Sequence, residues 1–425
     1  MSQLIMAARE APFPVEDIRH LFPALRKSDG FVFFDNAAGA QIPQTVLDAV
    51  TDHLVSHNVQ RGGRYEKSRA VDAAIAAARE SVALFLNASG PDEVAFGMNA
   101  TSFLRLVSLA LGETIRDRTE IILTDLDHEA NISVWLALQK QGACIRWWHI
   151  REDGRLHTED LDAVLSPRTL LVACTAASNA LGSIVDVAGV ARRAHAAGAE
   201  VMLDAVHYGP HGLFDVQAWD CDYLVCSGYK IFGPHMGFLW GKRAALAKLP
   251  TFREHFIPDA APAKIEAGTF VYENVSGMAA AIGYLEWLGG GSGQPASHEA
   301  RRVALTAGMG AIRAYEASLS EAMLQQLSGI DGVTVYGVSD PKLVACRVPT
   351  ICFNVRGMEP AEVCEQFAAQ GIGVRDGNMY APRLMDRLGL STGTGAVRAS
   401  LVHYNTHAEV HRFAAALRDM ATGKA

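Results

Sequence analysis

An acidic residue and a lysine stand 26 positions apart in this chain, and each follows a short apolar run. The runs VMLDA and YLVCS, within residues 201–234, predict two buried strands. Asp204 ends the first strand, and Lys230 lies just past the second in a glycine-flanked turn. Such a pair suits pyridoxal phosphate, because a lysine amine binds its aldehyde and a carboxylate contacts its pyridine nitrogen. The stretch therefore predicts a site for this cofactor.

Several other polar residues follow a predicted strand or begin a predicted helix. Thr101 and Ser102 begin a helix after the strand EVAFG, where free backbone N–H groups and the helix dipole favour a phosphate. A simple Ser/Thr N-cap explains the same residues equally well. Asparagines at such places also have a second explanation, because they form ordinary turns. The residues at predicted strand ends are Asn36, Thr101, His128, Asn179, Asp204 and Lys230.

The elements that must position these residues alternate along the chain. A long helix is predicted over about residues 67–86, and apolar strands alternate with helices from about residue 93 to residue 241. Continuous apolar strands in repeated βα units indicate a mostly parallel sheet that is buried on both faces. Ligands of such α/β sheets bind outside the carboxyl ends of the strands. We therefore expect the polar residues at strand ends to meet in one site.

The chain of 425 residues is longer than a single core usually supports, so two domains are expected. The run LGGGSGQPAS, residues 288–297, is typical of a linker. We predict a large α/β domain over residues 31–290 and a smaller α+β domain formed by residues 1–30 and 298–425. One amphipathic helix is expected around residues 15–25.

Composition excludes some classes of partner. The net charge of −8 argues against nucleic acid or an anionic membrane as a partner. No apolar run is long enough for a membrane span, and the first residues lack the apolar core of a secretory signal. The seven cysteines show no CxxC spacing. Buried, reduced thiols in a cytoplasmic protein are therefore expected.

Six motifs resemble, in their order along the chain, those of one enzyme family. They are LDHEANI, ASNALG, LDAVH, DCDYLVCSGYKIFGP, EAGT and VRASLVHYNT. As a set they are similar to class V, fold-type I pyridoxal-phosphate enzymes of the cysteine desulfurase and selenocysteine lyase group. The resemblance extends from residue 33 to about residue 417. It implies a large domain with a mostly parallel seven-stranded sheet, a smaller α+β C-terminal domain, and a homodimer.

The resemblance also implies a role for each site residue. Lys230 would bind the cofactor covalently and then carry the Cα proton, Asp204 would keep the pyridine nitrogen protonated, and His128 would stack on the ring and assist proton transfer. The other implied cofactor contacts are Ala100, Thr101, Asn179, His207, Ser227 and, from a second subunit, Thr269. The implied substrate contacts are Asn36, Arg375 and Arg398, of which the two arginines would clamp an α-carboxylate.

Two positions depart from the family pattern. His207 stands where these enzymes usually carry glutamine beside the cofactor's phenolic oxygen; its N–H can make the same hydrogen bond, but an imidazole titrates near neutrality. Tyr380, in the loop RDGNMYAPRLM, stands where desulfurases carry the cysteine that becomes a persulfide, and a phenol cannot take up sulfur.

His207 and His211 have a spacing seen in metal sites, but Gly209 and Pro210 exclude a helix there, so no metal site is predicted.

These departures imply a divergent, desulfurase-like subgroup. The leading hypothesis is a homodimeric lyase that cleaves a Cβ–S or similar Cβ bond of a small L-amino acid, with sulfide leaving free. One alternative is a class V aminotransferase or an amino-acid epimerase, in which Tyr380 serves as a second acid–base group opposite Lys230. A scaffold that binds the cofactor without turnover is the third alternative.

Overall fold

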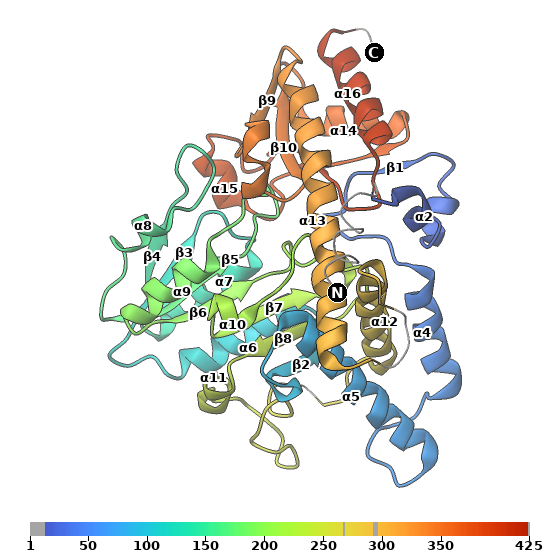
Figure 1. Ribbon diagram of the computed structural model, residues 1–425. Coiled ribbons are helices and arrows are strands. Elements are labelled where there is room, and N and C mark those ends of the chain that lie inside the picture. Colours follow the sequence, from blue (N-terminus) through green and yellow to red (C-terminus); the bar gives the residue numbers. More distant parts are fainter. Residues whose placement is uncertain (1–12, 267, 292–295, 424–425) are drawn as a thin grey trace.

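The computed structural model describes residues 13–266, 268–291 and 296–423 of the chain. A large α/β unit and a C-terminal α+β unit lie against each other, and the long helix α13 (His298–Ser328) runs along both of them (Figure 1). Within the described ranges, no helix is both long and apolar enough to cross a membrane.

The large unit is built on a seven-stranded sheet with the order β2-β8-β7-β6-β5-β3-β4. The strands from β7 to β4 in this order are parallel to one another, and β8 is antiparallel to both of its neighbours. This confirms the predicted mostly parallel sheet. The strands are β2 (Val94–Gly97), β3 (Glu120–Thr124), β4 (Cys144–Trp148), β5 (Thr169–Thr175), β6 (Glu200–Asp204), β7 (Tyr223–Ser227) and β8 (Gly237–Gly241).

Both faces of this sheet are buried, because successive strand residues enter two separate hydrophobic clusters. Leu203 and Leu224 pack in one cluster, whereas their neighbours Met202 and Val225 pack in the other. Near-continuous apolar strands are the sequence signature of such two-sided burial. The larger helices of this unit are α4 (Gln44–Ser56), α5 (Glu66–Leu86), α6 (Ala100–Gly112), α7 (Ala130–Leu136), α9 (Val187–Ala196) and α12 (Tyr272–Leu288). The shorter ones are α8 (Thr158–Leu161), α10 (Val216–Trp219) and α11 (Arg243–Lys248).

The C-terminal unit contains a four-stranded antiparallel sheet with the order β12-β13-β10-β9. Its strands are β9 (Val333–Tyr336), β10 (Thr350–Val355), β12 (Arg375–Gly377) and β13 (Ala396–Ser400). Its helices are α14 (Pro360–Ala369), α15 (Pro382–Arg387) and α16 (His407–Ala421). A separate parallel pair joins β1 (Val32–Phe33), near the start of the chain, to β11 (Ile372–Gly373).

The N-terminal segment differs from the prediction of one helix over residues 15–25. Two short helices are present, α2 (Val15–Arg19) and α3 (Pro23–Arg26). Pro23 begins α3, because a proline has no N–H to continue the preceding helix but suits a first helical position.

The predicted division into domains stays a prediction, and residues 1–12, 267, 292–295 and 424–425 of it lie outside the described residues. Val32 and Phe34 pack in the hydrophobic cluster of the C-terminal unit, although residue 31 was the predicted start of the large domain. Ile18 and Phe22 pack in the cluster that contains much of the large unit. The N-terminal segment therefore contacts both units.

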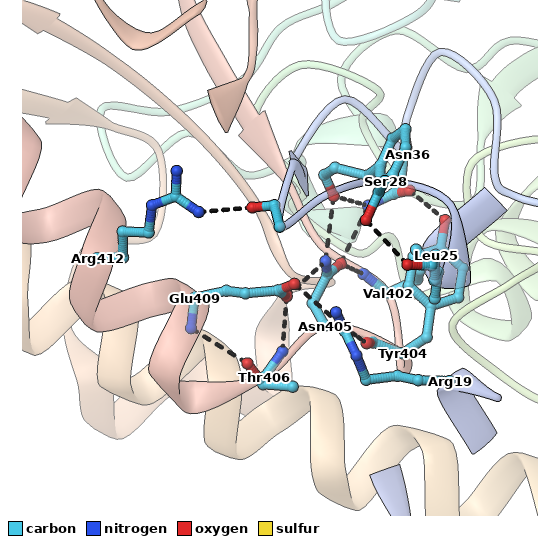
Figure 2. Close-up of polar contacts among 12 residues, drawn as sticks. Arg19, Leu25, Ser28, Asn36, Val402, Tyr404, Asn405, Thr406, Glu409 and Arg412 are labelled. Atoms are coloured by element: carbon cyan, nitrogen blue, oxygen red, sulfur yellow. Dashed lines mark hydrogen bonds and ion pairs between the residues drawn. The ribbon is translucent and has the colours of Figure 1, made fainter. Parts of the chain in front are cut away.

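The turn after β1 is tied to the C-terminal unit through two buried asparagines (Figure 2). Asn36 Nδ2 donates to the carbonyl oxygens of Phe33, at 2.7 Å, and Ser400, at 2.9 Å. The same nitrogen lies 3.1 Å from Asn405 Oδ1, and Asn36 Oδ1 accepts from the Tyr404 hydroxyl. The Asn36 amide is therefore occupied by the protein itself.

Asn405 is fully buried and also uses both ends of its amide. Oδ1 accepts from the Val402 N–H at 2.9 Å, and Nδ2 donates to the Phe33 carbonyl and to Glu409 Oε2, both at 3.1 Å. Glu409 forms an ion pair with Arg19 at 2.9 Å. This network fixes the N-terminal segment, the turn after β1 and the start of α16 relative to one another (Figure 2).

Asn405→Ala should lower the free energy of unfolding by about 3 kcal/mol, because several buried polar groups lose their partners at once. Denaturant unfolding followed by circular dichroism measures this loss. Asn58→Ala, at an exposed position, is the matched control and should change stability by less than about 0.5 kcal/mol. Equal losses in the two variants would contradict the role given to Asn405.

Candidate active site

Asp204 and Lys230 lie at the carboxyl ends of neighbouring parallel strands, as predicted. Asp204 is the last residue of β6, and Lys230 ends the short 3₁₀ turn Gly228–Lys230 that follows β7. Their side chains are 7% and 8% exposed and line one cavity. The other predicted cofactor residues that line this cavity are Ala100, Thr101, His128, Asn179, His207 and Ser227. The structure thus brings together every predicted cofactor residue except Thr269.

The start of α6 forms one end of this cavity. Asn99, not a serine or threonine, is the N-cap of the helix: its side chain accepts from the Ser102 N–H at 2.9 Å in a capping box. The Ala100 N–H donates to Ser227 Oγ at 3.1 Å. Thr101 therefore plays no part in the cap, and its hydroxyl is available at a helix N-terminus, where a phosphate is favoured.

The charged groups in the cavity have altered pKa values. Burial raises the pKa of Asp204, whose Oδ1 accepts from the Val206 N–H at 3.0 Å. Burial and the nearby Arg398 guanidinium lower the pKa of Lys230 to about 8. Burial, Lys230 and Arg398 lower the pKa of His128 to about 4, so that this ring is neutral. Nδ1 of His128 accepts from the Ala130 N–H at 3.0 Å, which places the ring proton on Nε2.

His207 is also neutral, which corrects the expectation that it titrates near neutrality. Burial, with His211 nearby, lowers the pKa of its imidazole well below the usual value. Its Nε2 lies 2.9 Å from Thr350 Oγ1, and its buried Nδ1 has no partner among the described residues. When the threonine hydroxyl donates to Nε2, Nδ1–H is left as a free donor. This is the tautomer that fits a phenolic oxygen of the cofactor.

The two predicted substrate arginines lie side by side and line an adjoining cavity of about 380 Å³. Arg375 on β12 and Arg398 on β13 are direct cross-strand partners. Asp35, which was not predicted as a site residue, accepts from both of them: its carboxylate lies 2.6 Å from Arg375 Nη2 and 3.1 Å from Arg398 Nη2. Its position after a short strand was the only sequence signal for this contact.

Asn179 joins the two cavities. Its side-chain Nδ2 donates to the Met379 carbonyl at 2.7 Å, and its backbone carbonyl accepts from Arg398 Nη1 at 2.9 Å. Its Oδ1 is buried and, in the described part of the chain, has no hydrogen-bond partner. Arg398 Nε is also buried and unpaired among the described residues. Three residues of the site therefore each keep one unpartnered polar atom, namely Asn179, His207 and Arg398. Unpartnered buried atoms are rare. His207 Nδ1–H and Arg398 Nε–H are donors, so these two fit the oxygens of a cofactor and a carboxylate, whereas Asn179 Oδ1 can only accept from a donor.

Two predicted residues, Asn36 and Thr269, lie outside both cavities, whereas Tyr380 lines one of them. Asn36 lines neither cavity, and its amide is fully used in the junction described above, so the predicted substrate contact is not supported by the geometry. Thr269 is exposed outside both cavities, and its Oγ1 accepts from Gln60 Nε2 at 2.8 Å. Tyr380 lines the adjoining cavity, is 65% exposed, and has its ring centroid 5.4 Å from that of His128.

The sequence-based predictions missed one further buried carboxyl. Asp127 accepts from the Thr124 hydroxyl and from Asn131 Nδ2, the latter at 2.7 Å. Burial raises its pKa to about 8, which keeps it protonated at neutral pH. The motif LDHEAN contained this residue, but only the structure shows that it is buried beside the histidine. Among the described residues, no group of three or more His, Cys, Asp or Glu is placed to hold a metal ion.

Comparison with known proteins places this chain in a family. The class V aminotransferase family matches residues 32–413. Aminotransferase-like protein FGM3 of Gibberella zeae is 35% identical, over 95% of this chain and 98% of its own. A cysteine desulfurase of Synechococcus elongatus is 34% identical, over 97% of this chain and 64% of its own length. The apo cysteine desulfurase from Thermococcus onnurineus NA1 has a similar structure, with a TM-score of 0.86 and 26% identity over 97% of this chain and 99% of that one.

The chain belongs to the class V aminotransferase family. It is a cysteine desulfurase-like member of this family of pyridoxal-phosphate enzymes, and the predicted fold class, enzyme class and cofactor are confirmed. Membership in a family of enzymes also disfavours the scaffold alternative. In this site, Lys230, Asp204 and His207 are the residues that would hold the aldehyde, the pyridine nitrogen and the phenolic oxygen.

The pKa of Lys230 predicts how cofactor-free protein captures pyridoxal phosphate. Only the neutral amine attacks an aldehyde, so the capture rate should rise with pH and level off above about 8, well below the usual lysine pKa. Stopped-flow absorbance at different pH values measures this profile. Arg398→Gln removes one cause of the lowered pKa and should move the inflection to higher pH. An inflection near 10 in the unsubstituted protein would contradict the assigned environment.

Proposed function

We propose that this enzyme is a lyase that removes the side-chain sulfur of a small L-amino acid, such as L-cysteine, as free sulfide. One observation carries the proposal: Lys230, His128 and Arg398 line the same cavity as Tyr380. By the family resemblance, Tyr380 stands where desulfurases carry their cysteine. The relatives named as cysteine desulfurases support the choice of a sulfur-containing substrate.

In this proposal, each residue acts at a defined place. Arg398 binds the α-carboxylate through its free Nε and orients the amino acid toward Lys230. The Lys230 amine, with its pKa lowered by burial, takes the Cα proton. Asp204 stabilises a proton on the pyridine nitrogen, and bound pyridoxal phosphate supplies an electron sink for the Cα–H electrons. When the Cβ–S bond breaks, the electron pair of that bond leaves with the sulfur. Tyr380 then supplies a proton to the departing sulfur.

The proposed reaction is balanced without an outside reductant. Loss of the Cα proton and of sulfide from cysteine is an elimination, and addition of water then yields the keto acid pyruvate and ammonia. A persulfide route would instead require a cysteine thiolate in the cavity. None of the seven cysteines lines either cavity in the described ranges. Cys226, on β7 near Lys230, is fully buried, and burial raises the pKa of its thiol.

A second candidate function is transamination or epimerisation at Cα. Tyr380 favours it, because this ring lies beside His128 and lines the cavity together with Lys230. Two acid–base groups at one Cα are what an epimerase requires. The relative named as aminotransferase-like also supports this alternative.

We also propose that the active enzyme is a homodimer in which Thr269 reaches the phosphate of the partner's site. Thr269 is exposed and lines neither cavity of its own chain. Large apolar side chains are exposed on the same unit, with Met98 68%, Leu109 64% and Phe252 96% exposed, and a second subunit would cover them.

The free cysteines suit a reducing compartment, so we propose that the enzyme acts in the cytoplasm.

Purified holoenzyme supplied with L-cysteine should release sulfide, pyruvate and ammonia in equal amounts, measured by colorimetric and coupled assays. Lys230→Ala should abolish release. Tyr380→Phe keeps the ring but removes the hydroxyl, and should lower the rate roughly 100-fold. Exchange of the Cα hydrogen for deuterium, with the side chain retained, would instead favour the second candidate. Alanine formation together with enzyme-bound persulfide would contradict the lyase.

The shared site predicts complementation between two defective variants. Lys230→Ala and Thr269→Val chains should each bind the cofactor poorly, but mixed dimers contain one site with both residues intact. Mixing the chains should therefore restore activity in about a quarter of the sites if the chains pair at random, and in about half if every dimer is mixed. Sedimentation measures the dimers, and sulfide release measures the active sites. Thr306→Val, on the exposed face of α13, is a control that should need no rescue. A monomer, or mixed dimers without rescue, would contradict the shared site.

A further inference from the structure

Asp35 places a carboxylate of the protein itself between the two substrate arginines. Its Oδ2 accepts from Arg375 Nη2 at 2.6 Å and from Arg375 Nε at 2.9 Å. Its Oδ1 accepts from Arg398 Nη2 at 3.1 Å. Oδ1 also accepts from Arg375 Nε at 3.1 Å, so Arg375 contacts both oxygens and the carboxylate bridges the two guanidinium groups.

Arg398 still has a donor for a substrate. Its Nη1 donates to the Asn179 carbonyl at 2.9 Å, and its Nη2 is used by Asp35, but its buried Nε has no partner among the described residues. Arg375, in contrast, directs both Nε and Nη2 at Asp35. The cluster therefore keeps one free donor for a ligand carboxylate, on Arg398, while the Nε and Nη2 donors of Arg375 are used by Asp35.

Two guanidinium groups pair with one carboxylate, which leaves the charge of one unpaired arginine; the exposed Asp376 also acts on Arg375, but it forms no ion pair with it among the described residues. Burial makes the remaining charge effective: the Arg398 side chain is 4% exposed and that of Asp35 is 26% exposed. The other charged group that faces the cavity is Lys230, whose amine also senses both Arg398 and Asp35. A ligand with two carboxylates would place its second negative charge beside Asp35, at a high electrostatic cost.

We propose that Asp35 is a specificity-determining residue that restricts this site to amino acids with a single carboxylate. Its carboxylate uses the guanidinium donors that a side-chain carboxylate of the ligand would otherwise need, and its charge repels dicarboxylic substrates. The inference depends on the proposed function only in that the ligand is an amino acid. Asp35 acts through the two arginines and does not itself contact the reacting atoms.

A purely structural role for Asp35 makes a different prediction. If the carboxylate served only to hold the two arginines in place, removing either partner of the ion pair would weaken ligand binding in the same way. If it sets the charge of the cluster, Asp35→Asn and Arg375→Gln must act in opposite directions, because they raise and lower that charge. The two roles can therefore be separated.

The test uses holoenzyme and two unreactive probes, propionate with one carboxylate and succinate with two. Isothermal titration at constant ionic strength gives both dissociation constants for the unsubstituted enzyme, Asp35→Asn, Arg375→Gln and the double variant. Asp35→Asn should strengthen succinate binding relative to propionate roughly tenfold, and Arg375→Gln should weaken propionate binding roughly tenfold. The double variant restores the original charge and should bind propionate as the unsubstituted enzyme does.

Asp386→Asn, at an exposed position on α15, is the matched control and should leave both constants unchanged. Two results would overturn the proposal: an unchanged succinate-to-propionate ratio in Asp35→Asn, or a loss of binding of the same size in Asp35→Asn and Arg375→Gln. If Asp35→Asn does not fold, Arg375→Gln and the double variant still give the test. Since neither probe has an amino group, the outcome is independent of sulfide release, which tests the proposed reaction separately.

Discussion

Charge balance at the carboxyl edge of the large sheet is the constraint on which the site depends. Lys230 and Arg398 are both buried, and two like charges in a medium of low dielectric constant destabilise each other unless carboxylates lie nearby. Asp204 and Asp35 provide those carboxylates, and both oppose the lowering of the Lys230 pKa. The result is an amine that loses its proton near neutral pH, beside a guanidinium that stays charged. Proton transfer needs the neutral amine of Lys230, and carboxylate binding needs the charged guanidinium of Arg398.

The two units contribute different parts of this arrangement. The seven-stranded sheet provides Asp204 and Lys230, whereas β12 and β13 of the C-terminal unit provide the two arginines. The turn after β1 carries Asp35 and is held on the C-terminal unit by the buried amides of Asn36 and Asn405 (Figure 2). The position of the carboxylate clamp therefore depends on a junction that contacts no ligand.

Much of the cofactor site was predictable from the sequence, because its signals are local. Asp204 and Lys230 follow apolar runs, and the carboxyl ends of parallel strands meet at one edge of the sheet. The contacts of Asp35 were not predictable, since its partners lie 340 and 363 residues away along the chain. The inward position of Asn36 and the neutral state of His207 depend on burial that no local pattern encodes. The break at Pro23, in contrast, was available from the sequence, because proline interrupts a helix.

The function of the site requires that the cofactor is attached to Lys230, and peptide mapping after borohydride reduction measures this attachment. Reduction of holoenzyme converts a lysine-bound pyridoxal phosphate into a stable adduct, and mass spectrometry of the digested chain locates it. We expect a single pyridoxyl group on the peptide that contains Lys230, and none in the Lys230→Ala variant. An adduct on a different lysine, or a holoenzyme that yields no adduct, would contradict it.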